Sequence, residues 1–197
     1  MNKISENSDG VRRVFLIHGW EGAPRSNWFP YVTLELKADG FDVSAPQMPH
    51  ADHPRVKEWL TFLKDYVGKP DKDTYFIGHS LGCIAIARYL EALPKRAKVG
   101  GCVFVAGFSG RIDVEEVREF YELPFDAEKA KIHCGQSVMI FSDNDPYVPM
   151  EKSLEMAKQM GAKTILERGK AHFQTSGGVT ALPSVVNALR KMTKTTE

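Results

Sequence analysis

Apolar residues along the chain alternate between two patterns. Short runs rich in Val, Ile, Phe and Tyr are typical of buried β-strands. They cover residues 13–18, 41–45, 74–77, 99–106, 137–141 and 164–167. Longer segments with apolar residues three or four positions apart predict helices over residues 28–38, 56–67, 81–93, 150–160 and 179–192. Because these strands and helices alternate, the sequence predicts an α/β fold: a doubly wound, mostly parallel sheet of about six strands with helices on both faces.

One connection is longer than the others. Residues 109–136 follow the fourth predicted strand and contain two short helical patterns, over residues 113–121 and 126–133. Because this segment leaves the sheet at the carboxyl end of a strand, we expect a short insertion that borders the active site. It is too short for a separate cap domain, so residues 1–197 are expected to form one domain, with residues 1–10 as a disordered tail.

Composition narrows the range of functions. The 197 residues are 43% apolar, enough for a substantial core, and 26 basic residues balance 25 acidic residues to a net charge of +1. Basic clusters with interleaved aromatic residues are absent, so a nucleic-acid partner is not indicated. No apolar stretch approaches the ~20 residues of a membrane span, and residues 1–10 lack a signal-peptide core. The three cysteines have no C-x-x-C spacing, which favours a reducing, cytoplasmic location.

The candidate chemistry begins at the pentapeptide Gly78-His79-Ser80-Leu81-Gly82, between a predicted strand and a predicted helix. A serine between two glycines in such a turn is typical of a nucleophile elbow. Glycine is needed on both sides because flanking side chains would collide in so sharp a turn. The sequence therefore predicts Ser80 as a nucleophile whose hydroxyl projects from the edge of the sheet.

A serine nucleophile needs a base, and the base needs an orienting carboxylate. In folds with this elbow the partners follow in the order serine, acid, histidine. Asp145 comes shortly after the predicted strand over residues 137–141, and His172 comes in the loop after the strand over residues 164–167. We therefore predict that His172 is the base and that Asp145 orients its ring.

Asp143 is the alternative acid. Asp145 is favoured because it precedes Pro146-Tyr147-Val148-Pro149, which matches the D-x-x-V-P pattern of acid loops. Asp143 is expected instead to cap the turn through its own side chain.

An oxyanion hole requires two backbone N–H donors near the nucleophile. One donor is expected from Leu81, directly after Ser80, and the second from the loop that follows the first strand. There Gly19 allows close approach of the backbone, and the N–H of Trp20 is the candidate donor. His18 is expected to order this loop rather than act as a base.

The candidate substrate-pocket residues lie near the predicted strand ends. They are Gly19, His79, Phe108, Tyr147 and Phe173. Trp28 and Trp59, which fall within helical patterns, are expected to be structural. The histidines and cysteines lack the spacing of a metal site, so neither a metal nor an organic cofactor is expected.

Four motifs in this order resemble the small, lidless serine hydrolases related to retinoblastoma-binding protein nine. They are His18-Gly19-Trp20-Glu21-Gly22 with Trp28-Phe29-Pro30, the loop from Met48-Pro49 to Pro54 that leads to Trp59, Gly78-His79-Ser80-Leu81-Gly82-Cys83, and Ser142-Asp143-Asn144-Asp145-Pro146-Tyr147-Val148-Pro149. The resemblance covers nearly the whole chain and implies an α/β-hydrolase fold with a Ser80–Asp145–His172 triad.

The chain departs from this family in two respects. The residue before the histidine is usually glycine, whereas here it is Ala171. The pattern Leu-x-Cys-x-Glu, which binds retinoblastoma-type pocket proteins, is absent, and its nearest approach is residues 81–85. Binding to such a partner is therefore not supported.

The sequence thus indicates a cytoplasmic serine hydrolase that acts on small ester, thioester or amide substrates, with esters favoured. Two alternatives remain at this stage. A catalytically weak binding or scaffold protein could retain the same fold, and an acyltransferase could use the same three side chains.

Overall fold

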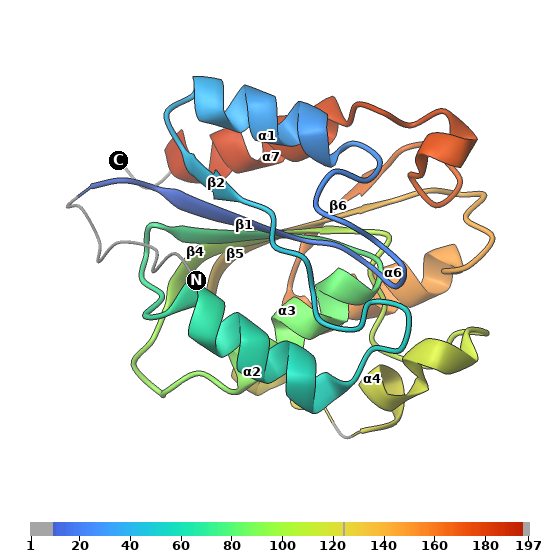
Figure 1. Cartoon of the computed structure of the whole chain (residues 1–197), viewed down its shortest axis with the longest axis horizontal. Helices are drawn as coiled ribbons and strands as arrows, with labels where there is room; N and C mark the ends of the chain where they lie inside the picture. The colour runs from blue at the N-terminus through green and yellow to red at the C-terminus, as the bar shows by residue number, and fades with distance from the viewer. Residues whose placement is uncertain (1–9, 124, 195–197) are drawn as a thin grey trace.

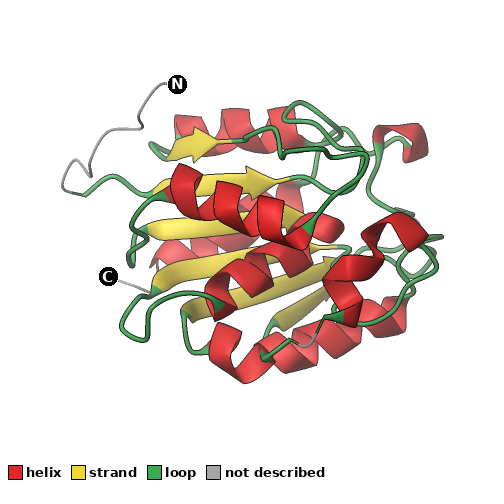
Figure 2. Cartoon of the chain, turned by 60° about the horizontal axis from the view of Figure 1, so that its bottom comes forward, coloured by secondary structure: helices red, strands yellow, loops and turns green. Residues whose placement is uncertain are grey.

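The computed structural model describes residues 10–123 and 125–194, so the tail expected at residues 1–10 lies outside the description except for Gly10. Within these residues, six parallel strands form one sheet in the order β2-β1-β3-β4-β5-β6 (Figure 1). The strands are β1 (Arg13–Ile17), β2 (Asp42–Ser44), β3 (Thr74–His79), β4 (Val99–Val105), β5 (Cys134–Phe141) and β6 (Lys163–Leu166). Their carboxyl ends all lie at one edge of the sheet, as the arrowheads in Figure 2 show.

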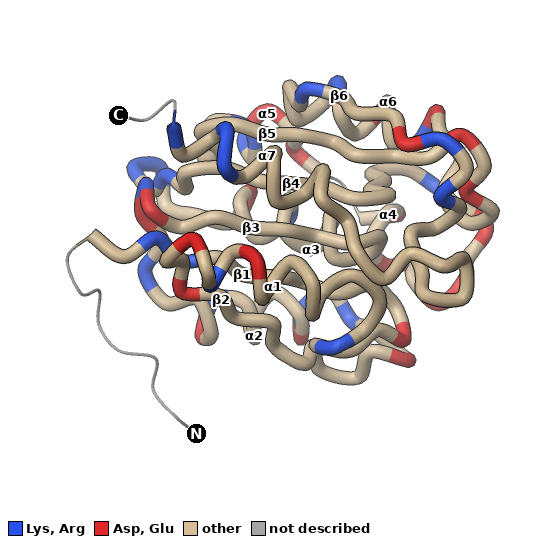
Figure 3. The backbone as a smooth tube through the Cα atoms, turned by 90° about the horizontal axis from the view of Figure 1, so that it is seen from above, with Lys and Arg blue, Asp and Glu red and all other residues tan. Residues whose placement is uncertain are grey.

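Burial along the strands follows their position in the sheet. All six residues of β3 are buried, because this central strand is covered on both faces, as expected for a parallel sheet. In contrast, no residue of the edge strand β6 is buried. Charged residues lie mostly on outer loops and helices, and the central strands are largely free of them (Figure 3).

Helices cover both faces of the sheet (Figure 1). The bounds are α1 (Phe29–Ala38), α2 (Val56–Val67), α3 (Leu81–Glu91), α4 (Arg118–Glu122), α5 (Ala127–Lys131), α6 (Met150–Met160) and α7 (Pro183–Lys194). Helices α1 and α7 lie on one face, whereas α2, α3 and α6 lie on the other. No helix in the described part of the chain is both long and apolar enough to cross a bilayer.

Apolar spacing explains which side of each helix is buried. In α2, Val56, Trp59, Leu63 and Val67 form one stripe that packs in the core beneath the sheet. Helix α3 is buried from Leu81 through Leu90 because it lies against the sheet and contacts helices on its other sides. This central helix therefore holds the serine turn at its amino end in a rigid setting.

The predicted strands and helices are confirmed in order and type, and some bounds differ. Helix α7 begins at Pro183 rather than at Val179, because proline has a backbone angle suited to a first helical turn and lacks the N–H that such a turn leaves unpaired. Strand β5 begins at Cys134, three residues before the predicted start. Residues 109–136 contain a short 3₁₀ helix, Glu115–Val117, followed by α4 and α5.

Candidate active site

Ser80 lies in the turn between β3 and α3 with φ 53° and ψ −119°. A serine at positive φ is strained, and such strain persists only where the surroundings enforce it. A Cβ at Gly78 would lie 2.9 Å from the Cα of Cys83, and a Cβ at Gly82 would overlap the Ile17 carbonyl oxygen. Both flanking positions therefore require glycine because backbone approaches them closely.

We expect Gly82→Ala to destabilise the protein by about 3 kcal/mol, because the added methyl group must push β1 away from α3. Urea unfolding followed by circular dichroism measures this change. Gly177→Ala is the matched control: its Cβ would meet the Ala171 side chain at an ordinary 3.8 Å, so stability should change by less than about 1 kcal/mol. Equal effects of the two substitutions would contradict this explanation of the turn.

His172 and Asp145 form a buried pair. The Nδ1 atom of His172 lies 2.8 Å from Oδ2 and 3.0 Å from Oδ1 of Asp145, and the two side chains are 7% and 2% exposed. The backbone N–H groups of Tyr147 and Val148 donate to Oδ1 of Asp145 at 2.9 and 3.0 Å and fix its orientation. Since an ionised carboxylate only accepts, Nδ1 of His172 carries the proton and Nε2 keeps its lone pair in the neutral ring.

Asp143 does not contact the imidazole. Its carboxylate accepts from the N–H of Gly169 at 2.9 Å and pairs with the Arg168 guanidinium at 3.0 Å. The hydrogen bond to Gly169 is the main cause of the lowered pKa of this exposed carboxyl group. The expected turn cap therefore missed the main partners of Asp143, which lie on the loop that carries His172.

Neighbouring side chains hold the same histidine loop. Ser142 Oγ accepts from the N–H of Lys170 at 3.0 Å, and Asn144 Oδ1 accepts from the N–H of Ala171 at 2.8 Å. Ser142 Oγ also donates to Asn144 Oδ1. Ala171, where the resembling family has glycine, has φ 45°, so these hydrogen bonds hold a residue that bears a side chain in a strained conformation.

Ser80 and His172 line a common cavity of about 270 Å³ at the carboxyl edge of the sheet. The predicted pocket residues Gly19, His79, Phe108 and Tyr147 also line it. Within the described residues, Ser80 Oγ makes no hydrogen bond with His172. Hydrogen bonds between catalytic groups are often long without substrate and tighten when it binds.

Phe173 does not line this cavity, so its prediction as a pocket residue was wrong. Its side chain is completely buried in the core on the α1 and α7 face of the sheet. The backbone at Phe173 has φ 54°, which turns the chain immediately after His172. The two adjacent side chains therefore point in different directions.

Several cavity residues were not identified individually from the sequence. The wall from the 109–136 segment consists of Ile112, Val114 and Val117. The others come from the loop after β1, the first residue of α1 and the loop after His172, and are Glu21, Gly22, Ser26, Asn27, Phe29 and Gln174. The position of this segment after β4 indicated that it borders the active site. Its residue pattern did not show which of its side chains face the cavity and which face the core.

The two candidate oxyanion donors lie beside Ser80. The N–H of Leu81 is at the first position of α3, where no preceding helical carbonyl is available. A Cβ at Gly19 would lie 3.0 Å from the Cβ of Ser80, so only glycine lets the loop after β1 approach this closely. The next residue, Trp20, lines the cavity, and its indole N–H donates to the Asp52 carbonyl at 3.0 Å, which holds the loop in place.

His18 orders this loop, as expected. Its Nε2 accepts from the N–H of Met48 at 3.0 Å, so Nδ1 carries the proton and donates to the Gly19 carbonyl at 2.8 Å. Burial lowers the pKa of His18, which favours this neutral form. His18 thus links two loops at the edge of the sheet.

His79 holds the loop that carries His172 through a hydrogen bond to its backbone. Its Nε2–H donates to the backbone carbonyl of His172 at 2.9 Å, and the two rings lie 5.0 Å apart. Burial lowers the pKa of His79 to about 3, and the nearby His172 contributes to the decrease. His79 is therefore neutral across the physiological pH range.

Because the pKa of His79 is lower in the folded chain than the ordinary 6.5, the unfolded chain binds one more proton between about pH 6.5 and 3. Stability should therefore fall as pH falls through this window, by up to about 1.4 kcal/mol per pH unit from this residue. Urea unfolding at several pH values should give a shallower fall for His79→Gln, whose amide can still donate but does not titrate. If stability fell equally steeply with pH in the wild type and in His79→Gln, the lowered pKa of His79 would be contradicted.

Metal-binding groups do not gather in the structure. Across residues 10–123 and 125–194, no three His, Cys, Asp or Glu side chains come close enough together to hold a metal ion. The cysteines Cys83 and Cys102 are buried, and burial raises their pKa, so their thiols stay protonated.

Comparisons with known proteins find similarity along nearly the whole chain. A family model described as serine hydrolase matches residues 14–191. The hydrolase YdeN of Bacillus subtilis is 34% identical over 180 residues, which cover 91% of this chain and 95% of that protein. Its crystal structure, at 33% identity, has a TM-score of 0.90 and covers 93% of this chain and 100% of that chain.

Two further proteins extend the comparison. Serine hydrolase RBBP9 of Rattus norvegicus is 30% identical over 161 residues, which cover 81% of this chain and 80% of that protein. The structure of Est1E from Butyrivibrio proteoclasticus has a TM-score of 0.73 at 18% identity and covers 95% of this chain and 90% of that chain. At that identity the likeness concerns the fold alone. The resemblance drawn from the sequence motifs is confirmed.

Proposed function

Since the chain belongs to the serine hydrolase family and has the α/β-hydrolase fold, we propose that it hydrolyses small carboxylic esters through an acyl-enzyme on Ser80. The observation that carries this proposal is the buried His172–Asp145 pair at the same cavity as the strained Ser80. This combination supplies a nucleophile, a base and an orienting acid in the order that the fold requires.

In the first half of the proposed reaction, Nε2 of His172 accepts the proton of the Ser80 hydroxyl while Oγ attacks the ester carbonyl carbon. Asp145 keeps the proton on Nδ1 and stabilises the imidazolium that forms. The tetrahedral intermediate then collapses, the bond to the alkoxide breaks, and His172 gives its proton to the leaving alcohol. Ser80 remains acylated.

The second half repeats these steps with water. His172 accepts a proton from water, the hydroxide attacks the acyl carbon, and the bond to Oγ breaks as the proton returns to Ser80. In both halves the backbone N–H groups of Trp20 and Leu81 are the proposed donors to the negatively charged oxygen. Losing one such donor typically reduces the rate about 100- to 1,000-fold.

Esters are the favoured substrate class over amides because an alkoxide leaves more readily than an amine. The cavity wall supports a modest acyl group: Phe108, Ile112 and Val117 give it an apolar side. A volume of about 270 Å³ lies just below the usual range for small-molecule pockets, about 300–1,000 Å³. Short acyl groups therefore match the cavity better than long chains.

We expect p-nitrophenyl acetate and butyrate to be cleaved with kcat/KM at least about tenfold higher than the laurate ester, a difference of about 1.4 kcal/mol. Absorbance assays across a series of acyl lengths measure this preference. Replacing Val117 by Ala should raise the relative rate of the longer esters, because the smaller side chain enlarges the cavity on its apolar side. A preference for laurate over acetate would contradict the proposed acyl site.

The same assay tests the alternatives. A binding or scaffold protein would show no turnover of any ester at a rate above that of Ser80→Ala. An acyltransferase would divert the acyl group to added alcohol or amine acceptors, which product analysis by mass spectrometry detects. Hydrolysis that is unchanged by these acceptors supports the proposed reaction with water.

A further inference from the structure

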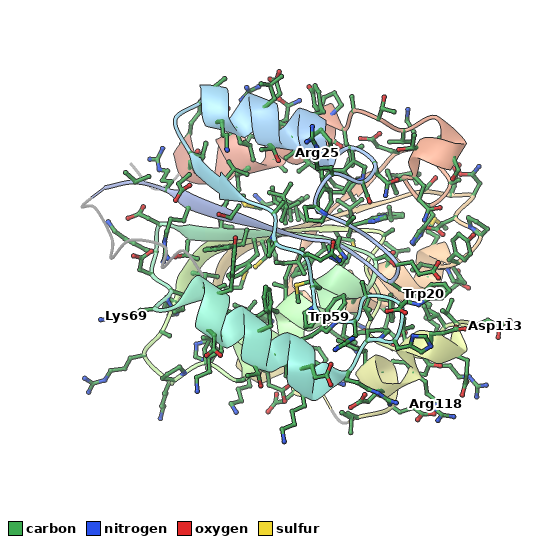
Figure 4. All side chains as sticks on the ribbon, in the orientation of Figure 1. Trp20, Arg25, Trp59, Lys69, Asp113 and Arg118 are labelled. Carbon is green, nitrogen blue, oxygen red and sulfur yellow. The ribbon has the colours of Figure 1, made fainter. Side chains whose placement is uncertain are left out.

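A second, larger groove lies at the end of the sheet opposite to Ser80. It is formed by the carboxyl ends of α2 and α3 and by the turns that lead into β3 and β4, and its volume is about 720 Å³. In Figure 4, Lys69 marks this end of the molecule, and Trp20 marks the end with the active-site cavity. Among the described residues, none lines both cavities.

The groove has an apolar lining. Leu60 on α2, Pro70 in the turn before β3 and the segment after α3 contribute the aliphatic side chains, which are Leu60, Pro70, Ala92, Leu93, Pro94 and Ala97. The volume falls within the range of about 300–1,000 Å³ that is usual for sites that bind small molecules. An apolar chain or ring would therefore find both space and contact here.

Positive charge surrounds this apolar lining. Five exposed cationic side chains line the groove: Lys64, Lys69, Lys72, Arg96 and Lys98. Among the lining residues Asp71 is the acidic one, and its Oδ1 accepts within its own turn from the N–H of Asp73 and the hydroxyl of Thr74. The lining therefore carries a formal charge of +4, whereas the whole chain carries +1.

Tyr89 adds a polar group to the groove lining. The residue is 3% exposed, and its hydroxyl has no hydrogen-bond partner in the described part of the chain. Burial raises the pKa of Tyr89 to about 12, so the hydroxyl keeps its proton at neutral pH and remains a donor. A buried donor without a partner costs free energy that an acceptor on a ligand would recover.

From the apolar lining, the basic rim and the unpaired Tyr89 hydroxyl, we infer that this groove binds a small amphipathic anion. The chemical class is a free carboxylate on an apolar chain of medium length. The chain packs against Leu60 and Leu93, and the carboxylate pairs with the lysines of the rim and accepts from Tyr89. This site is separate from the active-site cavity, and the inference does not depend on the proposed esterase activity.

Titration of ¹⁵N-labelled protein with decanoate, below its micelle concentration, tests the site directly. The expected result is saturable shifts for the backbone amides of residues 68, 69, 71, 72, 92, 93 and 95–98, and smaller shifts at Gly19, Ser80 and His172. Lys69→Glu/Lys98→Glu should weaken binding at least about tenfold, and Tyr89→Phe by about threefold or more. The matched control Lys57→Glu/Lys158→Glu makes the same charge change on exposed lysines outside the groove and should bind like the wild type.

Other ligands test whether the groove recognises the negative charge of decanoate and whether it binds a free molecule. Decyltrimethylammonium has a similar chain and the opposite charge, so it should not shift the groove amides. Equal binding of this cation, or of uncharged decanol, would overturn the charge argument. Shifts confined to the active-site loops, or no saturable shifts at millimolar decanoate, would overturn the site. Binding to anionic vesicles without binding to free decanoate would also overturn it, since the inferred ligand is a free molecule.

Discussion

Ser80→Ala should lower kcat for p-nitrophenyl acetate by about 10⁴-fold or more, to the rate that the remaining site groups support. The substitution removes the atom that would be acylated, and alanine retains the Cβ that packs near Gly19. A steady-state assay, with burst-phase analysis of the wild type, measures this loss. Positive φ at residue 80 strains alanine as it strains serine, so the fold should be retained.

Ser109→Ala is the matched control for this experiment. Ser109 follows β4, and its buried hydroxyl has no hydrogen-bond partner among the described residues. Its removal should leave kcat within about twofold of the wild type, because no proposed step uses it. Substantial ester turnover by well-folded Ser80→Ala would place the nucleophile elsewhere.

Asp145→Asn should lower kcat by about 10⁴-fold at neutral pH. An asparagine amide facing Nδ1 of His172 can donate there, which moves the imidazole proton to Nε2 and removes the base that Ser80 needs. The backbone donors Tyr147 and Val148 still have an oxygen to bind, so the loop should keep its shape. Steady-state kinetics across pH measure the loss.

Asp143→Asn supplies the comparison that decides between the two carboxylates. Asp143 holds Gly169 and Arg168 rather than His172, so its replacement should reduce kcat by about tenfold or less. An asparagine oxygen can still accept from Gly169, which should preserve most of the loop. If Asp143→Asn were the more damaging substitution, the assignment of Asp145 as the orienting acid would be wrong.

Local chemistry explains why much of this site could be predicted from the sequence. The turn at Ser80 depends on glycines within two residues, and the acid and histidine follow strands with clear apolar patterns. The carboxyl ends of parallel strands meet at one edge of the sheet, so Asp145 and His172 were expected to meet. The family and the fold were likewise indicated by the order of these motifs.

Features that depend on distant contacts were not predictable in the same way. The bond of Asp143 to Gly169 spans 26 residues, and nothing in the local sequence distinguishes it from a turn cap. Phe173 follows His172 directly, yet its positive φ turns it into the core. The wall formed by Ile112 and Val117 depends on how α4 and its neighbours pack over the sheet, which local spacing does not encode.

The hydrogen bonds around His172 connect the fold to the proposed chemistry. Side chains from the loop after β5 hold successive N–H groups of the histidine loop, and His79 holds the His172 carbonyl. A base fixed in this way loses little freedom when substrate binds. The contacts that hold Ala171 in its strained conformation therefore also orient the ring of His172, the proposed base.

The most direct test of the central claim is labelling with a fluorophosphonate probe, read by intact mass spectrometry. The probe reacts with serines that a neighbouring base has activated. The account predicts one adduct on the wild type and on Ser109→Ala, and none on Ser80→Ala. No adduct on well-folded wild type, or an adduct that persists in Ser80→Ala, would contradict an activated Ser80.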